Sequence, residues 1–336
     1  MIIERPTDGR EGYSDRMAYL MACLSDLVYI KFNKPPLQPK IAQIVKEGLE
    51  KYPKKPFLLL KFFEAVNYDP EQNRSKLFSE LQLLDLRCDN FFDQNDTQAM
   101  LVEHKDFLVL VFRGTEKTSY RDIYNDFNIR QIPADGGKTH KGFYSAYEEV
   151  HNQIQSTLVK KEFLAKPLYI TGHSLGGALA TIAARKIKHK GGILACYTFG
   201  SPRVGDSNWI SSITPPIKVP IYRIVNAIDV VTMLPPDKII RGVCFLLKFI
   251  PYMKKFALWL KQRFGNYMHT GDMRYLTNCP KGDYRSVKLL YSVDIFFRIG
   301  GSLKAAGSWG WGKLLADHKI NIYKEKLKIL AEQRNT

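Results

Sequence analysis

This chain of 336 residues has few acidic residues relative to basic ones, few cysteines and no long apolar run. Its five cysteines are scattered without a Cys-x-x-Cys pair, which argues against a disulfide framework or a cysteine-ligated metal site. No apolar stretch reaches the roughly 20 residues that a membrane-spanning helix needs. The sequence therefore predicts buried, reduced thiols in a soluble globular protein.

The amino-terminal residues lack the features of a secretory signal. The stretch from Met1 to Glu11 has five charged residues and has neither a basic start nor an apolar core. We therefore expect a cytoplasmic or peripheral membrane location. Secretion through another kind of signal stays open.

Acidic residues are too few to balance the basic ones, so the formal net charge is +17. An excess of this size suits either a nucleic acid or an anionic membrane surface. No zinc finger, RNA-recognition motif or phosphate-binding glycine-rich loop accompanies the charge. We therefore expect peripheral contact with an anionic membrane and no nucleic-acid partner.

The amino-terminal part, about residues 1–95, has mainly helical patterns. Apolar residues recur at three- and four-residue spacing from Ser14 to Phe32, which predicts an amphipathic helix with Ser14 as its N-cap. Helical patterns broken by prolines follow to about Leu86. The sequence does not indicate a function for this stretch.

Strands and helices alternate after about residue 98. The apolar run 107–112 predicts a strand buried on both faces, and further strands are expected at 168–171, 193–199 and 221–225. Helical patterns cover about 142–164 and 175–187 between them. This order predicts an α/β fold with a mostly parallel central sheet and helices on both faces.

A candidate nucleophile lies at one of these strand-to-helix junctions. The sequence Gly-His-Ser-Leu-Gly at residues 172–176 fits the Gly-x-Ser-x-Gly pattern, in which a strained turn exposes the serine at the carboxyl end of the sheet. Only glycine-sized neighbours permit the close approach of strand and helix there. We predict that Ser174 is the nucleophile and that the backbone N–H of Leu175 contributes to an oxyanion hole. His173 is expected to point away from Ser174.

The residues around Ser174 resemble the nucleophile region of class 3 lipases, the fungal-lipase-like family. Three further motifs resemble that family in the same order: Phe-Arg-Gly-Thr at 112–115, His-Lys-Gly-Phe at 140–143 and Thr-Phe-Gly-Ser-Pro-Arg-Val-Gly at 198–205. The resemblance spans about Ala99 to Pro236. It implies an α/β-hydrolase fold that cleaves carboxylic esters of lipids without a cofactor or metal.

A serine nucleophile needs an imidazole base and a carboxylate that orients it, in the order Ser, Asp or Glu, His along this fold. Asp229 follows the strand that ends at Val225, and the resemblance assigns the acid to this position before a Pro-Pro pair. Two downstream histidines satisfy the order, His269 and His318. We favour His318, which resembles the family's terminal Asp-His with a tyrosine five residues on.

The resemblance also assigns the oxyanion loop and a lid. By analogy with the family's Arg-Gly-Ser/Thr loop, Thr115 supplies the second oxyanion donor beside Leu175. The lid corresponds to about residues 117–127, which hold few large apolar side chains. A short, mixed lid buries little apolar surface when closed, which weakens the case for strong activation at an oil interface.

We expect a single α/β-hydrolase domain over residues 1–336, with its catalytic core at about 96–236 and 267–336. The core is interrupted at about 237–266 by a basic, apolar insertion, and a second unusual stretch, rich in glycine, covers 296–311. Insertions in this fold commonly cover the active site. We therefore predict a cap-like helical insertion in which Phe245 to Trp259 form a cap or a membrane-docking surface.

The sequence thus predicts a serine ester hydrolase that acts on acylglycerols or phospholipids. An acyl-enzyme would form on Ser174, with His318 as base and Asp229 as orienting acid. The alternative is a catalytically silent hydrolase fold that binds membranes or other proteins. A complete Ser, Asp and His set argues against that alternative, because binding alone does not require the combination.

Overall fold

The structure is a computed structural model. It describes residues 12–30, 47, 69–114, 130–211, 219–235, 253–255, 258, 266–280, 282–294, 297, 298, 300 and 316–333.

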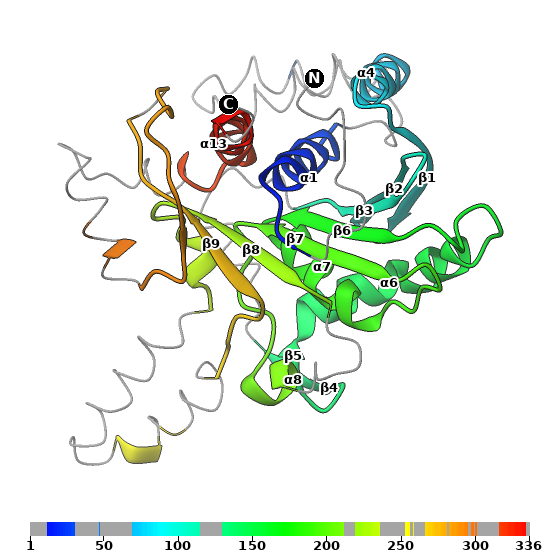
Figure 1. The fold of residues 1–336 in the computed structure, drawn as a ribbon. Helices are drawn as coiled ribbons and strands as arrows, with labels where there is room; N and C mark the ends of the chain where they lie inside the picture. The colour runs from blue at the N-terminus through cyan, green and yellow to red at the C-terminus, as the bar shows by residue number, and fades with distance from the viewer. Residues whose placement is uncertain are drawn as a thin grey trace.

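One eight-stranded sheet organises the described chain (Figure 1). Its five middle strands run parallel, whereas the pairs β1–β2, β2–β3 and β9–β10 are antiparallel. This confirms the predicted mostly parallel centre. In spatial order the strands are β1 (Arg87–Gln94), β2 (Thr97–Glu103), β3 (Leu108–Phe112), β6 (Leu168–His173), β7 (Ile193–Phe199), β8 (Ile221–Asn226), β9 (Asp272–Leu276) and β10 (Leu289–Tyr291).

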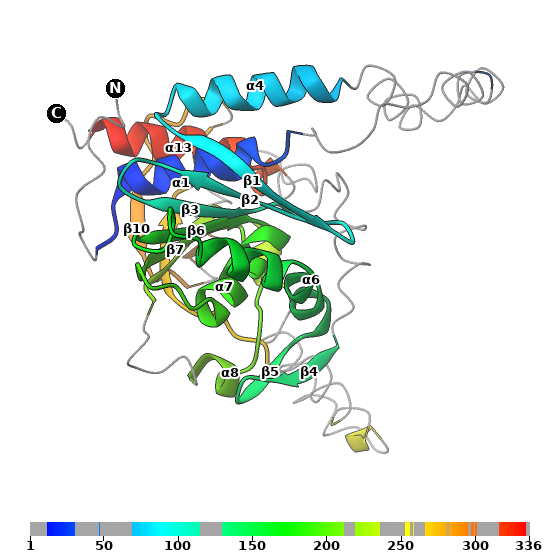
Figure 2. The same ribbon diagram turned by 90° about the vertical axis from the view of Figure 1, so that its right-hand side faces the viewer.

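Helices cover both faces of this sheet, as Figure 2 shows, with α4, α1 and α13 on one side and α6 and α7 on the other. Two shorter elements, α8 (Ser207–Ser211) and the hairpin of β4 (Gln131–Ala134) and β5 (Gly137–His140), lie together beyond α7. The long helices are α1 (Asp15–Leu27), α4 (Pro70–Gln82), α6 (Lys141–Leu158), α7 (Leu175–Lys186) and α13 (Ile320–Gln333).

Strand β3 shows why the apolar run predicted a strand buried on both faces. All five of its residues are buried. Val109 and Val111 belong to the core cluster under α1 and α13, while Leu108 and Leu110 belong to the cluster under α6 and α7. Successive side chains point to opposite faces of a strand, so a strand between two helical layers must be apolar at every position.

Three local features differ in extent from the sequence-based expectation. Ser14 caps α1, since its Oγ accepts from the N–H of Met17, but the helix ends at Leu27. Helix α6 ends at Leu158, and the apolar residues up to 164 lie in turns. Strand β1 lies within the stretch expected to be helical; its burial alternates only in part, which hides the strand pattern.

Several predicted features lie outside the described residues. These are the lid at 117–127, most of the insertion at 237–266, most of the glycine-rich stretch at 296–311 and most of 31–68. Within the described part of the chain, no helix combines the length and the apolar character needed to cross a membrane.

Candidate active site

Ser174 occupies a tight turn between β6 and α7. Its φ of +58° and ψ of −125° form a backbone conformation that side-chain-bearing residues rarely adopt. A Cβ on Gly172 would lie 2.2 Å from the carbonyl oxygen of Gly176, and a Cβ on Gly176 would lie 2.3 Å from that of Phe112. Both contacts are far inside van der Waals distance, so the turn requires glycine at these two positions.

Three residues distant in sequence meet at this turn. The Oγ of Ser174 lies 2.8 Å from Nε2 of His318, and Nδ1 of the same ring lies 2.9 and 3.0 Å from the two carboxylate oxygens of Asp229. His318 comes from the residues just before α13, and Asp229 comes from the loop after β8. All three side chains are buried.

This geometry fixes which atoms carry protons. Both oxygens of Asp229 accept from Nδ1, so the neutral His318 ring holds its proton there and leaves Nε2 as an acceptor for the Ser174 hydroxyl. A distance of 2.8 Å lies within the reach required of a general base. The arrangement can therefore activate the hydroxyl as a nucleophile.

Asp229 is held from several sides. The hydroxyl of Tyr323 donates to Oδ2 at 2.5 Å, and the N–H of Val231 donates to Oδ1 at 3.0 Å. The buried guanidinium of Arg298 donates to the carbonyl oxygens of Ala227 and Asp229 at 3.1 and 3.0 Å. Sequence reasoning did not identify Arg298, although a lone arginine in an apolar stretch was an available signal.

The second candidate base lies elsewhere. The Nε2 of His269 is 2.7 Å from the carbonyl oxygen of Thr232 and therefore donates to it. Burial and the nearby arginines, Arg223 foremost, hold the pKa of His269 well below its usual value. The structure thus brings His318, and not His269, to Ser174.

Of the two predicted oxyanion donors, Leu175 lies among the described residues and Thr115 does not. Leu175 is the first residue of α7, where a helical N–H has no acceptor within its own helix. Thr115 lies outside the described residues. Its neighbour Gly114 is beside the nucleophile, since a Cβ placed on Gly114 would lie 3.3 Å from Cβ of Ser174.

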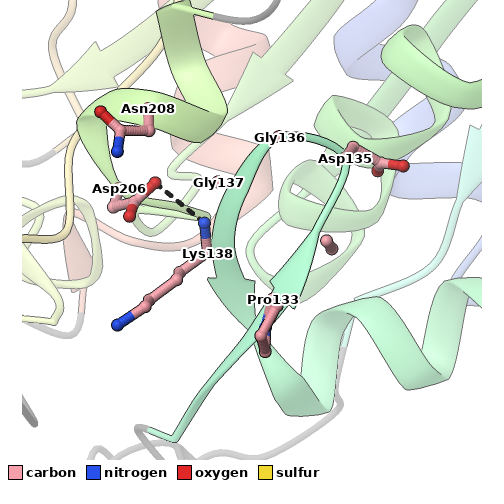
Figure 3. Close-up of a pocket in the computed structure, with 8 residues that line it drawn as sticks. Pro133, Asp135, Gly136, Gly137, Lys138, Asp206 and Asn208 are labelled. Carbon is pink, nitrogen blue, oxygen red and sulfur yellow. Dashed lines mark hydrogen bonds between the residues drawn. The ribbon is translucent and has the colours of Figure 1, made fainter.

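A pocket away from these residues is shown in Figure 3. It lies between the β4–β5 turn and the start of α8, where the backbone N–H of Lys138 donates to Oδ1 of Asp206 at 3.0 Å. None of Ser174, Asp229 and His318 lines it. We therefore assign it no part in the chemistry.

Among the residues that the structure describes, no three or more histidine, cysteine, aspartate or glutamate side chains gather where they could hold a metal ion.

Comparison with known proteins relates this site to lipases. Residues 109–239 match the model of the lipase (class 3) family. A lipase of Rhizomucor miehei is 35% identical over 153 residues, which cover 42% of this chain and 41% of that protein. A secreted mono- and diacylglycerol lipase 1 of Fusarium solani is 36% identical over 135 residues, which cover 38% of this chain and 39% of that protein. The match thus spans about two fifths of the length of these curated relatives.

The fold also has solved counterparts. The structure of a fungal lipase–inhibitor complex superposes with a TM-score of 0.50 at 20% sequence identity, over 84% of this chain and 86% of that chain. At this identity the likeness concerns the fold alone. Together with the sheet order and the turn at Ser174, it identifies an α/β-hydrolase fold.

Proposed function

We propose that this chain, whose residues 109–239 match the class 3 lipase family, is a serine ester hydrolase acting on lipid esters. The observation that carries the proposal is the hydrogen-bonded series from Ser174 Oγ through His318 to Asp229 on a strained, glycine-dependent turn. Such a buried series has a clear chemical use in acyl transfer.

In the proposed reaction, Oγ of Ser174 attacks the ester carbonyl carbon while its proton passes to Nε2 of His318. The tetrahedral intermediate collapses as His318 returns that proton to the leaving alcohol, and an acyl-enzyme remains on Ser174. Water, deprotonated by the same nitrogen, then releases the carboxylic acid. Asp229 stabilises the imidazolium in both steps.

The negative oxygen of the intermediate needs preorganised donors. We assign one to the backbone N–H of Leu175, at the positive end of α7. We assign the other to Thr115 by its place directly after Gly114, whose backbone lies beside Ser174. Loss of one such donor typically slows turnover by about a hundredfold or more.

Covalent trapping tests the assignment of the nucleophile. A fluorophosphonate probe is expected to label Ser174, as read by peptide mass spectrometry, and Ser174→Ala is expected to abolish both labelling and hydrolysis of p-nitrophenyl esters. Ser211→Ala is the matched control, because that hydroxyl donates to the carbonyl oxygen of Ser207 within α8. Ester hydrolysis that survives Ser174→Ala would disprove the proposal. Vesicle binding by wild-type protein without any hydrolysis would support the catalytically silent alternative.

The substrate class follows from the relatives, whose names include lipase and mono- and diacylglycerol lipase. We propose acylglycerols or phospholipids as substrates. Incubation with defined mono-, di- and triacylglycerols and with phosphatidylcholine, followed by quantification of released fatty acid, discriminates between them. Release from none of these lipids, by a protein that is active on p-nitrophenyl esters, would refute the lipid assignment.

We also propose that the protein contacts anionic membranes at their surface and thereby has a peripheral membrane location. The net charge of +17 and the basic, apolar composition of residues 237–266 support this. In its described part, Lys254 and Lys255 are exposed and Leu258 is 56% exposed. Co-sedimentation with anionic vesicles is expected to exceed that with neutral ones and to fall when 237–266 is deleted. Equal binding in both comparisons would refute the contact.

A further inference from the structure

Three arginines from different elements lie around the loop that carries Asp229. Arg203, after β7, donates to the carbonyl oxygens of Met233 and Pro235. Arg298 donates to the carbonyl oxygen of Asp229 and to Oγ1 of Thr232. Arg223, on β8, is close enough to both for their charges to act on it. These residues form what we call the arginine cluster.

Arg223 differs from the other two because its guanidinium has no acceptor among the described residues. Its Nε is buried without a hydrogen-bond partner, and so is Oγ1 of Thr198, the residue that faces it on β7. Residues paired across neighbouring strands point to the same face of a sheet. Two unsatisfied polar groups therefore lie side by side next to the Asp229 loop.

The charges around Arg223 increase the cost of this arrangement. Burial, with the like charges of Arg298 and Arg203, lowers the pKa of Arg223 to about 9. The group is therefore still protonated at neutral pH. No carboxylate among the described residues forms a salt bridge with it. A cation with a buried Nε and no partner carboxylate among the described residues is unfavourable, so the cluster favours a bound anion.

We propose that the arginine cluster binds a phosphate-class oxyanion, either free phosphate or the phosphate of a lipid headgroup, which pairs with Arg223 beside Thr198. A guanidinium binds tetrahedral oxyanions through two parallel N–H bonds, and the Thr198 hydroxyl adds a donor. Arg203 and Arg298 both hold the 227–235 loop, so a bound anion also reduces the repulsion across the loop that positions Asp229.

Thermal unfolding measured in inorganic phosphate and in sodium chloride of equal ionic strength tests the site. Phosphate is expected to raise the melting temperature of the wild-type protein, because a ligand that binds only the folded state stabilises it. In Arg223→Met the rise is expected to vanish. In Arg285→Gln, which removes an exposed arginine paired with Asp283, the rise is expected to persist. An equal rise in Arg223→Met, or none in the wild type, overturns the proposal.

A second variant tests the proposal in case Arg223→Met does not fold. Arg223→Lys keeps the charge but loses the bidentate geometry, so isothermal titration is expected to give phosphate affinity at least about tenfold below wild type. Unchanged affinity overturns the proposal. Both experiments measure phosphate binding, so their outcome does not depend on whether the protein is an ester hydrolase.

The source of the phosphate is resolved by a second ligand. Short-chain phosphatidic acid, used below its micelle concentration, carries the same group on a glycerol ester. Binding tighter than that of inorganic phosphate and dependent on Arg223 identifies a lipid headgroup, whereas tighter Arg223-dependent binding of inorganic phosphate identifies the free anion. If neither ligand binds in an Arg223-dependent manner, the site does not exist.

Discussion

The ring of His173 lies against that of His318, with centroids 4.6 Å apart, and its Nε2 donates to the carbonyl oxygen of His318 at 2.6 Å. Its Nδ1 lies 3.0 Å from the hydroxyl of Tyr29, which therefore acts as the donor. Burial, together with the nearby His318, holds the pKa of His173 well below its usual value, so the ring is neutral. The residue next to the nucleophile thus anchors the backbone of the proposed base.

Replacing His173 tests this anchoring role. In His173→Leu the carbonyl oxygen of His318 loses its donor, which typically costs about 1–3 kcal/mol of stability for a buried group. We expect a lower kcat with little change in KM, because substrate binding is not altered. Tyr29→Phe removes only the outer hydrogen bond and should have a smaller effect. Unchanged kcat in His173→Leu at a temperature where it stays folded would exclude the role.

Mutation distinguishes directly between His318 and His269, the two candidates for the general base. His318→Ala is expected to lower kcat by about 10⁴-fold or more, since Ser174 loses its proton acceptor. His269→Ala should retain catalysis in the folded fraction but lose stability, because Thr232 loses its buried donor. Initial rates and urea unfolding of both variants provide the measurement. Comparable loss of kcat in both, with full folding, contradicts the assignment.

Arg298 is expected to act as a positioning residue through the backbone of Asp229. Arg298→Met would leave the acceptors on Ala227 and Asp229 unpaired and loosen the loop. We expect kcat to fall by about tenfold or more while KM stays near wild type, with a loss of several kcal/mol in stability. Tyr323→Phe, which removes one hydrogen bond to the Asp229 carboxylate, is the matched comparison. A change confined to KM would contradict this role.

The turn at Ser174 predicts a sharp difference between glycines. Gly172→Ala and Gly176→Ala place a methyl group 2.2–2.3 Å from backbone oxygens, so we expect destabilisation of at least about 2 kcal/mol and loss of activity. Gly12→Ala is the control, since its added carbon meets nothing within 4 Å. Thermal melting of the three variants tests this, and equal melting temperatures would show that the turn tolerates side chains.

Buried histidines predict a loss of stability in mild acid. His140 caps α6, since its Nδ1 accepts from the N–H of Phe143, and burial lowers its pKa to about 4. Between about pH 6.5 and pH 4 the unfolded chain binds a proton that the folded chain does not. The free energy of unfolding therefore falls with the pH across this window, by on the order of 3 kcal/mol for this group.

Urea unfolding at pH values from 7.5 down through that window measures the slope. His140→Asn keeps an acceptor for the Phe143 N–H and removes the titrating ring, so its slope should be shallower. A stability that rises as the pH falls would contradict the direction.

Local patterns in the sequence were sufficient for much of the fold. The continuous apolar character of 108–112, the small residues after Ser174 and the Ser14 cap each reflect interactions within a few residues, and the corresponding elements form where expected. The end of α6 and strand β1 were missed because apolar spacing alone does not encode where a helix stops or which strand edge is exposed.

By itself the sequence determined the turn at Ser174, because its positive φ and the tight contact of Gly172 with Gly176 depend on residues within one short segment. Only the tertiary structure decided which histidine meets that serine. The Ser174–His318 contact joins residues 144 apart, and the Arg298–Asp229 contact joins residues 69 apart. Such meetings depend on how α13 and the segment after β10 return to the sheet, and that path follows from packing of the whole core rather than from any local pattern.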